Sequence, residues 1–93
     1  MKVKITQEHI DQGIQSLRGP VHYRADQYCP TCFALREAFP EAKEVSVGFD
    51  LAFIDGRMYT VNHPEWIHNF IDEQPVQPTE FELVLAWFEL VLA

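Results

Sequence analysis

The residues of this chain whose type and spacing best suit chemistry are two cysteines separated by two residues. Cys29-Pro30-Thr31-Cys32 stands at the expected start of a helix, because proline suits the first helical position. A helix N-terminus favours the thiolate form of Cys29, and Cys32, one turn later, is placed to resolve a mixed disulfide. The pattern is therefore typical of a redox function, in which Cys29 and Cys32 would be the catalytic pair.

Tyr28 precedes the pair, and the resulting string resembles the Y-C-P-x-C active site of glutaredoxins. That resemblance implies a thiol-redox module. The rest of the chain argues against it, because a thioredoxin-type fold needs a βαβ unit and a hairpin preceded by a cis-proline. No proline precedes the hairpin that we expect at Asp55-Gly56.

The same two cysteines allow two further interpretations. A zinc site would combine Cys29 and Cys32 with two histidines, but the chain has no second C-x-x-C and no clear zinc-finger spacing among His9, His22, His63 and His68. Free cysteines are among the most buried residue types, so an inert pair is the third interpretation. We favour the inert pair, and we expect no catalytic residue, no metal and no other cofactor.

The net charge of −7 is concentrated towards the C-terminus. All seven lysines and arginines lie at or before Arg57. The acids beyond that point are Glu65, Asp72, Glu73, Glu80, Glu82 and Glu89. We interpret these acids as a candidate binding surface for a basic protein partner, such as a nucleic-acid-binding surface. Direct binding to nucleic acid or to an anionic membrane is disfavoured, because such sites need clustered lysine and arginine. A solvated acidic face that maintains solubility is the other interpretation.

The 93 residues predict a single α+β domain, in which two to three short helices pack on a small antiparallel sheet. Asp55-Gly56 between two apolar runs predicts a two-residue hairpin and, with the strand before it, a meander. Strands are expected at 2–5, 44–48, 51–54, 57–61 and from 80 onward, with a weaker extended segment at 21–24. Helices are expected at 7–12 (ended by Gly13), 14–17, 30–39 and 64–71, the last with Trp66, Ile67, Phe70 and Ile71 on its apolar side.

The C-terminal end repeats one apolar segment, Phe-Glu-Leu-Val-Leu-Ala, at 81–86 and again at 88–93. A helix would stack the two copies on one face, whereas a strand would place them on opposite faces, and both forms stay open. Either form exposes much apolar surface. We therefore interpret 84–93 as an apolar extension that joins the core or forms an oligomer contact, with a homodimer through Phe81–Ala93.

The expected location is the cytoplasm. No apolar run reaches the roughly 18 residues of a membrane span, and Lys2 and Lys4 lead directly into polar sequence, unlike a signal peptide. Two cysteines in such a chain favour free thiols in a reducing compartment.

Motifs spread over most of the chain resemble small, uncharacterised proteins of phages and prophages. Ile5–Gly13 matches their I-T-x-x-H-I-x-x-G opening, Cys29–Leu35 matches C-P-x-x-x-A-L, and Val45–Gly48 matches V-S-V-G. Phe70–Asp72 matches F-x-D, and Pro78–Leu83 matches P-x-E-F-E-L. The chain departs from this pattern at Cys32 and in running ten residues past Leu83. The resemblance implies an origin rather than an activity.

Small size, phage-like origin and one-sided charge together predict a non-enzymatic accessory protein in the host cytoplasm. Such a protein would bind and inhibit a host factor, as an anti-CRISPR-type antagonist of host defence does. The alternatives are a thiol-redox or zinc-binding module at Cys29 and Cys32, and a sponge for a signalling nucleotide. The sequence offers no clear phosphate cradle for that nucleotide.

Overall fold

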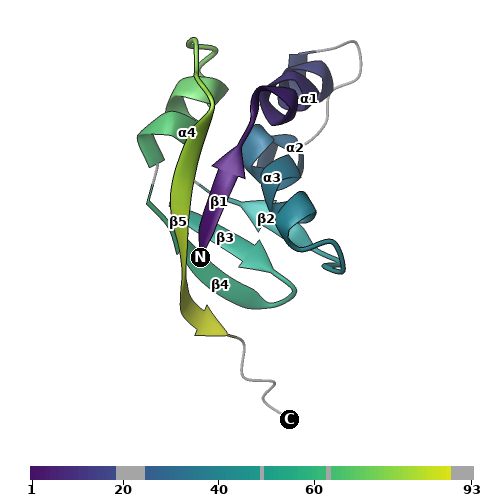
Figure 1. The fold of residues 1–93 in the computed structure, drawn as a ribbon, viewed down its shortest axis with the longest axis vertical. Coiled ribbons are helices and arrows are strands. Elements are labelled where there is room, and N and C mark those ends of the chain that lie inside the picture. Colours follow the sequence, from purple (N-terminus) through teal and green to yellow (C-terminus); the bar gives the residue numbers. More distant parts are fainter. Residues whose placement is uncertain (19–24, 49, 63, 89–93) are drawn as a thin grey trace.

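The computed structural model describes residues 1–18, 25–48, 50–62 and 64–88 (Figure 1). These residues form an α+β fold, in which a curled, five-stranded antiparallel sheet packs against short helices. The helices are α1 (Gln7–Arg18), α2 (Ala25–Tyr28), α3 (Pro30–Ala38) and α4 (Pro64–Ile71). The strands are β1 (Lys2–Ile5), β2 (Val45–Val47), β3 (Leu51–Ile54), β4 (Arg57–Val61) and β5 (Thr79–Phe88).

The strand order in the sheet is β1-β5-β4-β3-β2, and every neighbouring pair is antiparallel. The predicted meander is confirmed, with β2, β3 and β4 side by side. Asp55 and Gly56 connect β3 to β4 with φ values of 49° and 80°. Two consecutive positive φ angles are the signature of a type I′ turn, which glycine adopts freely and aspartate tolerates.

The first helix is longer than the sequence predicts, and the prediction that Gly13 ends it is wrong. α1 runs without interruption from Gln7 to Arg18 and includes the segment 14–17 that we expected to be separate. Gly13 is needed for a close approach of two helices, because a Cβ atom at this position would lie 2.6 Å from Cδ of Pro30. The glycine therefore marks a helix crossing rather than a helix end.

The other two predicted helices are confirmed. α3 begins at Pro30 and ends at Ala38, with Phe39 as its C-cap immediately before a proline. On the predicted apolar side of α4, Ile67 and Phe70 are buried and Trp66 packs against the core, whereas Ile71 is 39% exposed. Ile71 is the last helical residue, and no further turn of α4 shields it. α2 is not predicted from the sequence, and the predicted segment 21–24 lies outside the described residues.

One face of the sheet, the inner face, carries the hydrophobic core. Its buried side chains alternate along the strands: Val3, Ile5, Val45, Val47, Ala52, Ile54, Phe81 and Leu83. Figure 1 shows α1, α2 and α3 along one side of the sheet, and α3 contacts both β1 and β2. None of the described helices is long and apolar enough to cross a bilayer.

The C-terminal segment forms a strand as far as Phe88. β1 pairs with the first half of β5, and β4 pairs with its second half, with a register shift opposite Met58 and Tyr59. The first copy of the apolar repeat is therefore extended rather than helical. Most of the second copy lies outside the described residues.

Candidate functional site

The cysteine pair lies at the start of α3, where the sequence predicts it. Cys29 is the N-cap of this helix, and Pro30 follows at its first position. The two sulfur atoms are 3.1 Å apart, and the Cys32 thiol also donates to the carbonyl oxygen of Asp26 at 3.2 Å. Cys29 and Cys32 are only 3% and 0% exposed. The thiols are therefore free, in mutual contact and enclosed by the fold.

The contact between the two sulfurs shifts the pKa values of the two thiols in opposite directions. The hydrogen bond from Cys32 lowers the pKa of Cys29, and burial opposes this effect. The backbone N–H groups of Cys32 and Thr31 also favour the Cys29 thiolate. The same hydrogen bond, followed by burial, raises the pKa of Cys32. Cys29 is thus the thiol that ionises first, and Cys32 retains its proton.

The described surroundings of the pair lack two features that a glutaredoxin requires. Every strand pairing among the described residues is antiparallel, so these residues contain no βαβ unit, and they include no cis peptide bond. They also contain no group of three or more histidine, cysteine or acidic side chains that could hold a metal ion. Two of the predicted zinc ligands, His22 and His63, fall outside the described residues.

A cleft of about 490 Å³ opens between the end of α3 and the β3–β4 hairpin. Its polar lining comes from Glu41, Asp55, Arg57 and Tyr59. The Asp55 carboxylate already accepts hydrogen bonds from the backbone N–H groups of Lys43 and Glu44. Asp55 thus helps to hold the hairpin against the segment after α3, while Arg57 and Glu41 in the cleft are exposed.

The phage-like motifs build the scaffold. Thr6 caps α1 by accepting from the His9 N–H, and the Thr6 N–H donates to Nδ1 of His9 in return. Nδ1 is therefore an acceptor, so the buried imidazole donates through Nε2 to Glu37 on α3 at 2.5 Å. Gly13 and Pro30 meet at the crossing of α1 and α3. The motif residues Thr6, His9, Gly13 and Pro30 therefore help to join α1 to α3.

Three of the acidic residues predicted to form a binding surface are in ion pairs. Glu73 pairs with Arg18, Glu80 with Lys2, and Glu82 with the N-terminal amine of Met1. For Glu65 and Asp72 the described residues supply no ion pair, and Glu89 lies outside them.

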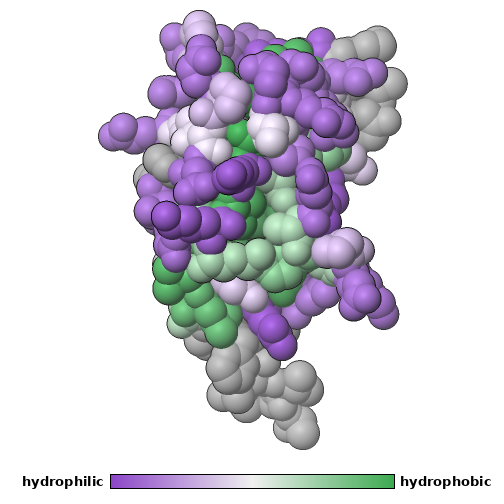
Figure 2. All heavy atoms as spheres, in the orientation of Figure 1, coloured by the Kyte–Doolittle hydropathy of each residue, from purple (hydrophilic) through white to green (hydrophobic). Residues whose placement is uncertain are grey.

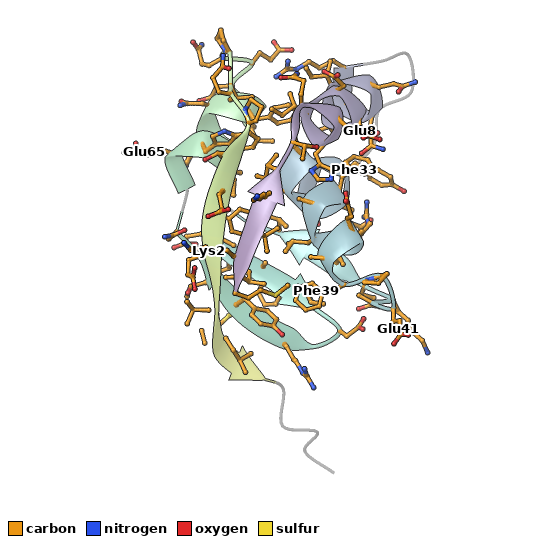
Figure 3. The ribbon with its side chains drawn as sticks, viewed as in Figure 1. Lys2, Glu8, Phe33, Phe39, Glu41 and Glu65 are labelled. Atoms are coloured by element: carbon orange, nitrogen blue, oxygen red, sulfur yellow. The ribbon has the colours of Figure 1, made fainter. Side chains whose placement is uncertain are left out.

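The remaining acids are widely distributed over the surface. Figure 3 shows Glu8, Glu41 and Glu65 on three separate parts of the molecule. Acidic side chains therefore lie on several parts of this view, although most of the net charge comes from the residues after Arg57.

The sheet also exposes a group of apolar side chains that the sequence reasoning missed. Direct strand partners share a face, so the register places Phe53 with Met58, and Leu51 with Thr60 and Val84, on the face opposite the core. Phe53 is 42% exposed and Val84 is 51% exposed, while Leu51 and Met58 are half-buried. We call Leu51, Phe53, Met58 and Val84 the outer apolar face. Strand alternation and the Asp-Gly turn together hold enough information to find it from the sequence.

The end of β5 extends this exposed surface. The pairing between β1 and β5 stops at the start of β1, where the Met1 carbonyl accepts from the Leu83 N–H at 2.7 Å. No described strand pairs with that edge of β5 beyond Leu83. Leu85 is 48% exposed. Figure 2 shows hydrophobic atoms at the surface over this end of β5, beside the grey C-terminal residues.

The predicted homodimer through Phe81–Ala93 bears on this same segment. Phe81 and Leu83 are each 2% exposed and belong to the core, so these two residues cannot form the contact. Val84, Leu85 and Ala86 are exposed and stay available for it. The homodimer itself stays a prediction.

Comparisons of the chain with protein families, with curated proteins and with solved structures find no match.

Proposed function

We propose that this domain is a non-enzymatic inhibitor that binds and blocks a host protein in the cytoplasm of a phage-infected bacterium. One observation carries the proposal: the outer apolar face leaves Phe53 and Val84 about half exposed on the side of the sheet opposite the core. Contiguous apolar side chains on a small domain mark a surface for another protein. The resemblance of Ile5–Gly13 and of the other motifs to phage and prophage proteins supports the proposed origin.

The charge of the domain selects the kind of partner. The outer apolar face continues along β5 and β1 into Glu80, Glu82, Lys2 and Lys4, whose charges largely cancel. The rest of the domain keeps a net charge of −7. We therefore infer a partner with an apolar contact area inside a basic rim, as on a nucleic-acid-binding host protein. Electrostatic attraction of this kind accelerates association and weakens as salt rises.

The proposal is tested by plating a phage on bacterial strains that each carry one defined defence system. The set includes CRISPR nucleases, restriction enzymes and a system that signals through a nucleotide. Expression of the protein should restore plaque formation in at least one strain of the set. If plaque formation were restored in none of the strains, the proposal would be overturned. Rescue confined to the strain that signals through a nucleotide would favour a sponge for that nucleotide.

Variants of the outer apolar face give the matched comparison. Phe53→Lys and Val84→Lys should abolish the rescue, because each places a charge in the contact area. Ile71→Lys is the control, since Ile71 is similarly exposed at 39% but lies on α4. All three side chains are roughly half in water, so each substitution should lower the free energy of unfolding by about 1 kcal/mol. Equal rescue by Phe53→Lys and by the control would exclude this face as the binding surface.

A further inference from the structure

We propose that Cys29 and Cys32 form a peroxide-sensitive thiol pair, which closes reversibly to an intramolecular disulfide. The proposed function does not use these side chains. Their sulfurs are 3.1 Å apart within one helical turn, and both lie inside the fold. The inference therefore assigns a chemical modification site separate from the binding face.

The arrangement gives the two sulfurs different roles. Cys29 is at the N-cap, where the N–H groups of the first helical turn and the helix dipole stabilise a thiolate. The thiol of Cys32 faces two acceptors, the Asp26 carbonyl oxygen at 3.2 Å and the Cys29 sulfur. Cys29 is thus the attacking sulfur, and Cys32 is the protonated thiol already in place to resolve the product.

The oxidant is hydrogen peroxide or another small hydroperoxide. The Cys29 thiolate attacks one peroxide oxygen and breaks the O–O bond, which leaves a sulfenic acid on Cys29, while the departing hydroxide takes up a proton to become water. The Cys32 sulfur then attacks the Cys29 sulfur. Its proton leaves with the sulfenic hydroxyl as a second water, and the S–S bond forms. The two thiols lose two electrons and two protons in total, and a dithiol reductant reverses the reaction.

Burial selects for a small oxidant. With exposures of 3% and 0%, neither sulfur can be approached in line by a bulky disulfide such as oxidised glutathione. Thiol–disulfide exchange needs such an approach, whereas peroxide is little larger than water. The folded protein should therefore discriminate between the two oxidants, and the unfolded chain should not.

Oxidation also has a local consequence for α2. A disulfide sulfur carries no hydrogen, so the donation from Cys32 to the Asp26 carbonyl is lost. α2 is only four residues long and contacts α3 directly. Amide exchange in residues 25–28 should accelerate on oxidation, while exchange in the β3–β4 hairpin should stay unchanged.

The test treats the reduced full-length chain with hydrogen peroxide and, in parallel, with oxidised glutathione. The protein is then alkylated in denaturant and its intact mass is measured. Peroxide, but not oxidised glutathione, should lower the mass by two hydrogens and leave both cysteines unalkylated. Cys32→Ser should stop at a sulfenic acid on residue 29, which dimedone traps when the protein is unfolded in denaturant. Cys29→Ser should react about tenfold or more slowly, having lost the activated thiolate. Circular dichroism establishes that both variants are folded.

Two results would overturn the inference. One is that both thiols stay reduced when the same peroxide treatment fully oxidises glutathione added as an internal control. The other is equal reactivity of Cys29→Ser and Cys32→Ser, which would remove the division of roles. Should a variant fail to fold, the wild-type rate against pH decides. Activation of Cys29 requires the rate to reach half of its plateau at a lower pH in the folded protein than in the unfolded chain, and an equal or higher midpoint contradicts it.

Discussion

The two faces of the sheet are built from alternate residues of the same strands, but the helices that the structure describes cover only the inner one. On the inner face Phe81 and Leu83 are each 2% exposed, whereas Phe53 and Val84 on the outer apolar face are 42% and 51% exposed. Leu85 belongs to the inner face, because it pairs with Tyr59, but it lies beyond the cover of the helices and is 48% exposed. Burial in this domain is set by what packs on a strand, and hydrophobic character alone does not decide it.

This contrast separates the scaffold from the candidate function. Motif residues such as Thr6, His9 and Gly13 hold α1 against the rest of the fold. The outer apolar face contains no recognisable motif, although its exposed apolar side chains are not explained by packing in the core. The motifs detected in this sequence therefore mark residues that hold the fold together. The proposed binding surface is identified instead from the register of the strands.

The sharpest test of the contrast is a pair of identical substitutions two residues apart. Leu83→Ala should lower the free energy of unfolding by about 2–5 kcal/mol, because it leaves a cavity in the core. Leu85→Ala should lower it by about 1 kcal/mol, since roughly half of the side chain is already in water. Urea denaturation of both variants provides the comparison. Similar losses would mean that Leu85 is covered in solution, as it would be in the predicted homodimer, and sedimentation of the wild type would then show that dimer.

A second test concerns the packed side alone. Gly13→Ala would stabilise an exposed helix by about 1 kcal/mol through helix propensity. Here the added Cβ would lie 2.6 Å from Cδ and 2.7 Å from Cγ of Pro30, so α1 and α3 would have to separate. We expect a net loss of about 1–3 kcal/mol, measured by thermal unfolding. Gln12→Ala, at an exposed position of the same helix, is the control. A stabilised Gly13→Ala would show that the crossing is loose.

The sequence predicts those elements whose signals are local. The Asp55-Gly56 turn, the helix that begins at Pro30 and the helix from Pro64 all depend on neighbouring residues, and all three are confirmed. The length of α1 could not be predicted, because Gly13 reads as a helix end unless the approach of Pro30, 17 positions away, is known. Pairing of β1 with β5 also joins opposite ends of the chain, and no local pattern specifies it.

The candidate site shows the same division. The position of Cys29 and Cys32 at a helix start follows from the sequence, whereas the 3.1 Å contact and the hydrogen bond to Asp26 depend on tertiary packing. Charge counting identifies the acidic residues. It misses the pairing of Glu80 and Glu82 with the other end of the chain, because that pairing exists only once β1 lies beside β5.

The smallest expected effect is a gain in stability on the packed side. Thr31 is 1% exposed, and its hydroxyl is the one buried side-chain oxygen or nitrogen among the described residues without a hydrogen-bond partner. Replacing it by valine keeps the shape and removes a group whose desolvation is uncompensated. We expect Thr31→Val to raise the free energy of unfolding by about 1 kcal/mol, which corresponds to about 4–8 °C in Tm for a domain of this size.

Thr31→Ser is the matched control for that substitution, because it keeps the hydroxyl and deletes the methyl group. It should destabilise the domain by about 1 kcal/mol, the cost of one lost methyl group in a packed interior. If Thr31→Val were instead destabilised to the same degree, the hydroxyl would have a partner in solution, such as a bound water or the Cys29 thiolate. Repeating both melts with the peroxide-treated protein would distinguish these two partners, because only the thiolate disappears on oxidation.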